Sequence, residues 1–87
     1  MNARQIEAFR AIARTGTVTA AAAALHISQP AVSRLLAHLE QQLDMALFQR
    51  AQGRLHLTPE GDALLTEVEQ HFVGLETLRR AASRIAH

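Results

Sequence analysis

Two helical patterns stand close together in one stretch of the chain, residues 19–40, which reads TAAAAALHISQPAVSRLLAHLE. The first pattern, residues 19–25, is mostly alanine, which has the highest helix propensity. His26 and Ile27 interrupt it, and Ser28 can cap a second periodic run that extends to about Leu43. A short helix, a tight turn and a second helix are typical of the helix-turn-helix motif, so this stretch predicts that motif.

The second helix of the motif has an apolar face and a small polar face. Helical spacing puts the core residues on one side: Val32, Leu35, Leu36, Leu39 and Leu43. The opposite side carries short, nearly neutral residues: Gln29, Pro30, Ser33, Arg34, Ala37 and Gln41. Pro30 is tolerated in the first turn, because its missing N–H would be unpaired there. A face of this kind predicts close contact with another surface through a few hydrogen bonds.

A further amphipathic helix is predicted upstream, over residues 4–14. Ile6, Phe9 and Ile12 share one face of it, and Gly16 is a suitable stop. Arg10 and Arg14 lie near its carboxyl end, where positive charge complements the helix dipole. Either Thr17 or Thr19 can cap the alanine-rich helix that follows.

A small β-hairpin is predicted after the motif. Two short pieces, residues 49–50 and 55–57, flank residues 51–54, with Gly53 at a turn position that needs positive φ. Arg50 and Arg54 then lie at the base and the tip of the hairpin. A helix-turn-helix with such a hairpin is the winged form of the motif, so the expected fold is mainly α with a small β-hairpin wing.

A long helix is predicted to follow, because Thr58 can cap it and Pro59 suits its first position. It extends to about Ala86, which at 1.5 Å per residue gives a length of roughly 40 Å. Its apolar stripe predicts a partner helix in a homodimer, although folding back on its own domain is the alternative. The stripe consists of Leu65, Val68, Phe72, Leu75, Leu78, Ala82 and Ile85. We therefore expect a winged helix-turn-helix domain over residues 1–58 and a dimerisation helix over residues 59–87.

Charge and composition reduce the range of functions that the chain can have. The net charge of +1 is divided unevenly, because residues 1–57 hold six arginines against three acidic residues and residues 58–87 have a net charge of −2. All nine basic residues are arginine, which suits recognition of phosphate and guanine. The chain has no cysteine, and it shows neither a signal peptide nor a membrane span, so we expect a soluble cytoplasmic protein.

No pattern in the sequence predicts catalysis. The five histidines are scattered without metal-binding spacing, and no glycine-rich loop for phosphate is present. Ser28 and Ser33 have no neighbours that would make a nucleophile of either hydroxyl. We therefore predict no metal, no cofactor and no enzymatic activity.

Double-stranded DNA is the predicted partner, because the major groove admits a helix and displays a distinct pattern for each base pair. Gln29 suits adenine, and Arg34 suits guanine or phosphate. The arginines of the wing suit the backbone or a narrow minor groove. Free N–H groups at the start of the alanine-rich helix suit a phosphate. The predicted DNA-binding residues are Thr19, Ser28, Gln29, Pro30, Ala31, Ser33, Arg34, Arg50 and Arg54.

The alternative is a protein-interaction module that dimerises through its long helix and does not bind DNA. A protein interface would more often expose aromatic or aliphatic anchors on the second helix of the motif. The outer face of residues 29–41 carries none, which favours DNA.

Particular runs of sequence resemble the N-terminal domain of LysR-type bacterial transcription regulators, over essentially the whole chain. The most specific are SQPAVSR at residues 28–34, LFQR at residues 47–50 and LTPEG at residues 57–61. The resemblance implies a winged helix-turn-helix, a linker helix that dimerises antiparallel, and an interrupted palindrome as the promoter site. Val18 stands where the family often has Phe, and Asp44 where it usually has Gly.

Family members carry an effector-binding domain after the linker helix, and no such domain is present in these 87 residues. We therefore expect the chain to be a fragment of a longer regulator. Residues 5–11, 53–56 and 74–75 look like the branch that contains the lysine-biosynthesis and opine-catabolism regulators. That resemblance implies an amino-acid-like effector for the full-length protein.

Overall fold

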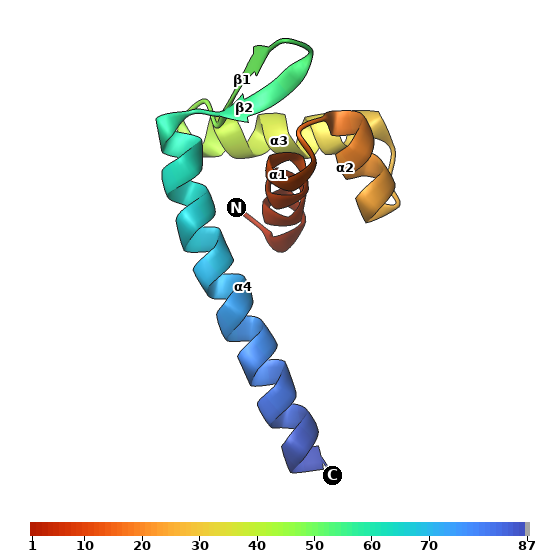
Figure 1. Cartoon of the computed structure of the whole chain (residues 1–87), viewed down its shortest axis with the longest axis vertical. Helices are drawn as coiled ribbons and strands as arrows, with labels where there is room; N and C mark the ends of the chain where they lie inside the picture. The colour runs from red at the N-terminus through yellow and green to blue at the C-terminus, as the bar shows by residue number, and fades with distance from the viewer. Residues whose placement is uncertain (87) are drawn as a thin grey trace.

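The computed structural model describes residues 1–86, so His87, the last residue of the predicted dimerisation helix, lies outside the described residues. Three helices and a hairpin form a head, from which a fourth helix projects (Figure 1). The predicted mainly α winged helix-turn-helix is confirmed. The elements are α1 (Ala3–Thr15), α2 (Val18–Leu25), α3 (Gln29–Leu43), β1 (Phe48–Ala51), β2 (Arg54–Leu57) and α4 (Pro59–Ala86).

Local capping explains where the helices of the motif begin and end. Thr17, rather than Thr19, caps α2, because its Oγ1 accepts a hydrogen bond from the N–H of Ala20 at 3.1 Å. The helices α2 and α3 end at His26 (φ 58°) and Asp44 (φ 53°), both in the left-handed conformation. Aspartate tolerates that conformation better than most residues, which accounts for Asp44 where the family usually has glycine.

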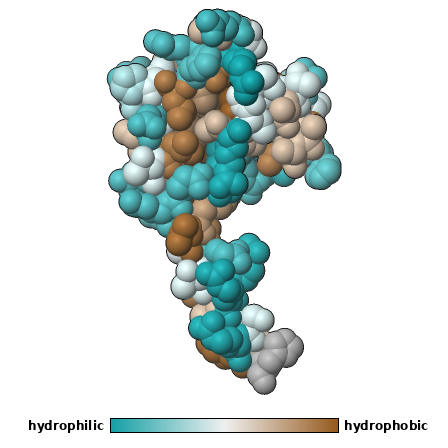
Figure 2. Space-filling view, in the orientation of Figure 1, coloured by the Kyte–Doolittle hydropathy of each residue, from teal (hydrophilic) through white to brown (hydrophobic). Residues whose placement is uncertain are grey.

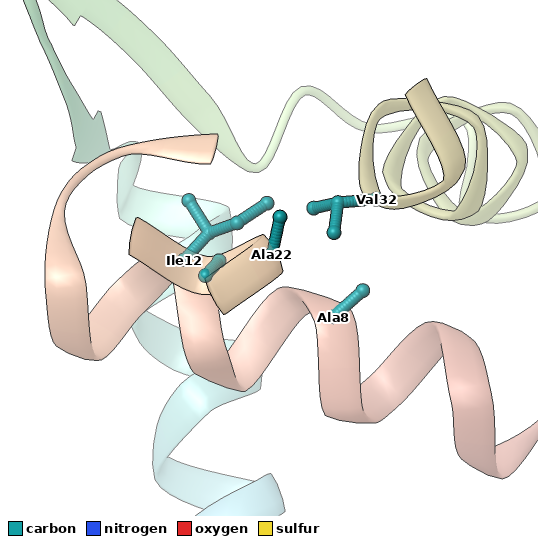
Figure 3. Packing of buried hydrophobic residues seen from close by; sticks show 5 residues of the cluster. Ala8, Ile12, Ala22 and Val32 are labelled. Atoms are coloured by element: carbon teal, nitrogen blue, oxygen red, sulfur yellow. The ribbon is translucent and has the colours of Figure 1, made fainter. Parts of the chain in front are cut away.

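The first core cluster joins α1, α2 and α3. Ala8, Ile12, Ala22 and Val32 point toward one another from the three helices, and each is at most 4% exposed (Figure 3). Small side chains on α1 and α2 let the helix backbones approach closely, as a core of this size requires. The alanine-rich stretch therefore has a structural role in bringing α2 and α3 together.

A second core cluster brings α4 into the head. Phe9, Leu39, Leu47 and Val68 are buried together, and the rings of Phe9 and Phe48 lie 5.5 Å apart. Leu64, Leu65 and Phe72 pack against the same cluster. Residue 58 directly precedes α4, and the core continues across this point.

The start of α4 is held by Thr58 and Gly61. Thr58 donates from its hydroxyl to the carbonyl oxygen of Ala46 at 2.6 Å, and its Oγ1 accepts from the N–H of Gly61 at 2.9 Å. A Cβ atom at Gly61 would overlap the carbonyl oxygen of Leu47. Only glycine therefore lets α4 begin so close to the chain that leads into β1.

The wing is a two-stranded antiparallel hairpin with a two-residue turn. Arg50 pairs with Leu55 and Ala51 with Arg54, which leaves Gln52 and Gly53 as the turn residues. Both have positive φ, 55° and 75°, as a turn that matches the twist of a hairpin requires. The N–H of Leu55 donates to the carbonyl oxygen of Gly16 at 2.9 Å, which attaches the wing to the corner between α1 and α2. No helix in the described part of the chain is long and apolar enough to cross a membrane.

Candidate nucleic-acid interface

A groove runs between the start of α2, the start of α3 and the wing. Five of the nine predicted DNA-binding residues line it: Thr19, Gln29, Pro30, Ser33 and Arg50. In Figure 1 the hairpin, α2 and α3 lie at the same end of the molecule, and residues from all three line the groove. Tertiary structure therefore brings together side chains from three separate segments of the sequence.

The outer face of α3 is open to solvent. Gln29, Ser33 and Arg34 are exposed, and Pro30 is exposed beside them. Ala31, by contrast, is half-buried. The Oγ of Ser28 accepts a hydrogen bond from the N–H of Ala31 at 3.2 Å and so caps the helix. Its own hydroxyl hydrogen remains available to an external acceptor.

The two arginines of the wing lie in different environments. Arg50 is exposed and lines the groove. Arg54 is exposed too, but its guanidinium lies against Gly16 and donates from Nη2 to the carbonyl oxygen of Thr15 at 3.0 Å. Arginine has five N–H groups, so this bond leaves others for a phosphate. Arg54 therefore also fastens the wing to the end of α1, a role that the sequence does not show.

This arrangement matches a known family. The family model for bacterial regulatory helix-turn-helix proteins of the lysR family matches residues 3–62. The chain belongs to the LysR family. The transcriptional activator LysR of Escherichia coli is 44% identical over 98% of this chain and 27% of its own length. The octopine catabolism/uptake operon regulatory protein OccR of Rhizobium meliloti is 42% identical over 98% of this chain and 29% of its own length.

The resemblance to the lysine-biosynthesis and opine-catabolism branch is thus confirmed, and these relatives are regulators rather than enzymes. A crystal structure of the BenM DNA-binding domain with catB site 1 DNA has a TM-score of 0.92 and 29% identity, covering 99% of this chain and 97% of that one. The predicted DNA-binding function is confirmed, and nothing supports the alternative of a module that does not bind DNA. The chain spans less than a third of the length of LysR and of OccR.

Other groove residues of this LysR-family domain were not predicted. Gly16, Val18, Gly53 and Leu55 line the groove alongside the polar residues. The apolar pair, Val18 and Leu55, carries no local signal of an interface, because its position depends on the bond between the wing and the α1–α2 corner. Gly16 and Thr17 precede α2, whose N-terminal N–H groups were the expected phosphate site.

The apolar stripe of α4 divides into two halves. Leu65, Val68 and Phe72 pack against the head of their own chain, and Val68 is only 6% exposed. Leu75, Leu78 and Ile85 are 58%, 65% and 86% exposed. Figure 2 shows hydrophobic surface on the head and again as separate patches along the projecting helix. The alternative that the helix folds back on its own domain therefore describes its first half only.

An apolar groove lies where α1 and α4 meet. Its lining includes Ile6 from α1 and Leu64, Val68, Phe72 and Leu75 from α4. The other lining residues are Met1, Ala3, Glu7, Glu67 and His71. The exposed half of the stripe and this groove are continuous, because Leu75 belongs to both.

Arg10 and Arg14 have a partner that their positions in α1 do not reveal. Both guanidinium groups contact Glu69 of α4, at 2.9 Å from Arg10 Nε and 3.3 Å from Arg14 Nη2. Hydrogen bonding from Arg10 is the main cause that lowers the pKa of the Glu69 carboxyl, and partial desolvation opposes it. The helix-dipole explanation of these arginines from the sequence did not include this contact.

Proposed function

We propose that the chain is the DNA-reading part of a dimeric LysR-type transcription regulator, which inserts the start of α3 into the major groove. The observation that carries this proposal is the exposed, short-chained face of α3 beside an open groove. Gln29 and Arg34 read base edges, and Ser33 bonds to a base or a phosphate. Pro30 and Ala31 contact a thymine methyl group.

Backbone contacts fix the register of the domain on the duplex. The start of α2, with Thr19 exposed beside its free N–H groups, binds one phosphate. Ser28 donates its hydroxyl hydrogen to another. Arg50 reaches from the wing to the backbone or to a narrow minor groove, with Arg54 next to it. Such contacts position the protein, and the start of α3 supplies the specificity.

A second copy of the chain covers the apolar half of α4. In an antiparallel pair of these helices, Leu78, Ala82 and Ile85 of one copy extend toward the α1–α4 groove of the other, and Leu75 lies near the twofold axis. Leu75, Leu78 and Ile85 are all exposed along one stripe of α4. A contiguous apolar surface of this kind is typical of a protein–protein contact, which supports the proposed dimer. The paired half-sites then lie about 34 Å apart, or a multiple of that distance.

The full-length regulator is proposed to work in the cytoplasm and to carry an effector-binding domain after α4. Residues 1–58 act as the winged helix-turn-helix and residues 59–87 as the dimerisation helix. An amino-acid-like small molecule is the proposed effector, which the similarity to OccR and LysR supports.

Selection of bound sites from random duplex DNA with the purified chain tests this function. We expect an inverted repeat bound with a Kd on the order of 10⁻⁸ M and a steep dependence on salt. Recovery of no preferred sequence would contradict the proposal and would favour the protein-interaction module.

Arg34→Ala tests the base-reading face. Affinity for the selected site should fall by about tenfold or more, as expected for loss of one bidentate base contact. Arg84→Ala removes the same charge from an exposed position on α4, far from the groove, and should leave the anisotropy titration nearly unchanged. Equal losses in the two variants would show that Arg34 contributes only general charge.

A further inference from the structure

One contact cluster joins α1 to α4 just before α4 leaves the head. It consists of Arg10, Arg14, Glu69 and Phe72, and we call it the α1–α4 anchor. The Glu69 carboxylate accepts from Arg10 Nε at 2.9 Å, from Arg10 Nη2 at 3.2 Å and from Arg14 Nη2 at 3.3 Å. The Arg10 guanidinium also stacks over the Phe72 ring, 4.1 Å from its centroid. Ion pairing and cation–π stacking thus act on the same guanidinium.

Together with the apolar packing of Leu64, Leu65 and Val68, the anchor holds the helix axis at a second point. The first is the start of α4, where Thr58 bonds to Ala46 and Gly61 lies against Leu47. Two separated points on a straight helix define its direction. Beyond Phe72 the helix leaves the head, since nearly every residue from position 73 to 86 is exposed.

Because part of α4 projects beyond the anchor, a small change in helix direction there becomes a larger displacement at the end of the helix. Residues 73–86 extend about 20 Å, so a tilt of about 10° at Phe72 moves the end of the helix by about 3 to 4 Å. That displacement is close to the rise of one base pair, about 3.4 Å. In a dimer held together by the projecting halves, the direction of α4 therefore sets the distance between the two reading helices.

We infer that Glu69, Arg10 and Phe72 are positioning residues that select the spacing between half-sites, without themselves contacting DNA. This inference rests on the proposed dimeric DNA-binding function. A partly exposed ion pair adds only modestly to overall stability, so its main effect here is on the direction of α4. The cluster also lies on the face of α1 that meets α4, away from the groove formed by α2, α3 and the wing.

The test uses duplexes that carry two inverted copies of the selected half-site, separated by spacers that differ by one base pair. Binding by the wild-type chain, Glu69→Gln and Glu76→Gln is measured on each duplex. Glu76→Gln is the matched control, because it removes a carboxylate that pairs with Arg79 and Arg80 within α4 only. Circular dichroism and affinity for a single half-site show whether each variant retains its fold.

We expect one optimal spacer for the wild-type chain and for Glu76→Gln. For Glu69→Gln, the preference for that spacer over its neighbours should fall by about threefold, or the optimum should move, with single-site affinity unchanged. A Glu69→Gln profile that superimposes on the wild-type profile would overturn the inference alone. A wild-type chain with no preference for paired half-sites would overturn the proposed function as well, before any variant is compared.

Discussion

At the scale of single residues, the absence of a side chain decides where α4 begins. Gly61 lies where a Cβ atom would overlap the carbonyl oxygen of Leu47, and that oxygen belongs to the backbone and cannot rotate away. Gly74, on the same helix, has no atom within 4 Å of the position that a Cβ would occupy. Substitution by alanine should therefore change the free energy of unfolding in opposite directions at the two glycines.

We predict that Gly61→Ala lowers the free energy of unfolding by about 1 to 3 kcal/mol, because the backbone must shift to admit the methyl group. Gly74→Ala should raise it by up to about 1 kcal/mol, since alanine favours an exposed helix. Urea unfolding followed by circular dichroism measures both. A Gly61→Ala chain as stable as the wild type would show that the start of α4 does not need this close approach.

At the scale of elements, the contact between α1 and α4 includes an ion pair that depends on the charge of one carboxylate. The pKa of Glu69 is lowered in the folded chain, mainly by the hydrogen bond from Arg10. The unfolded chain therefore binds a proton at Glu69 more readily than the folded chain does. The stabilisation is complete above the ordinary pKa of a glutamate and disappears as the pH falls through the lowered value.

We predict that the difference in stability between the wild-type chain and Glu69→Gln is largest near neutral pH and vanishes in acid. Thermal unfolding at a series of pH values measures it. Arg10→Gln removes the main partner of Glu69. The difference in stability between the Arg10→Gln chain and the Arg10→Gln, Glu69→Gln double variant should therefore depend less on pH. A difference that stays constant from neutral to acidic pH would mean that Glu69 acts through packing rather than charge.

At the scale of the whole molecule, the chain measures 48 Å by 26 Å by 22 Å because half of α4 has no partner within it. In the proposed dimer, a second chain covers the exposed apolar residues of that half. Burying a leucine is worth about 1.5 to 3 kcal/mol, so each side chain of the stripe should matter to assembly.

We predict that Leu78→Glu raises the dissociation constant of the dimer by about tenfold or more, because a charge replaces a buried apolar group. Val73→Glu is the control: Val73 is also 65% exposed, but it lies two residues before Leu75 and so points away from the stripe at 3.6 residues per turn. Sedimentation velocity across a range of concentrations measures the dimer. Equal effects of both substitutions would contradict a contact through the stripe.

The sequence by itself determined the helices of the motif, the wing and the long final helix, because each depends on neighbours a few residues away. Ser28 caps the helix that it precedes, and Gly53 permits its own turn. Periodicity likewise separated the buried face of α3 from the face that carries Gln29 and Arg34.

Only the tertiary structure decided which distant groups meet. Arg10 and Glu69 are 59 positions apart, and Arg54 reaches the carbonyl oxygen of Thr15 across 39. Periodicity assigned Val68 to the same stripe as Leu78, yet the head buries one and leaves the other exposed. A helical pattern shows which side of a helix is apolar, but the packing of the remaining chain determines what covers that side.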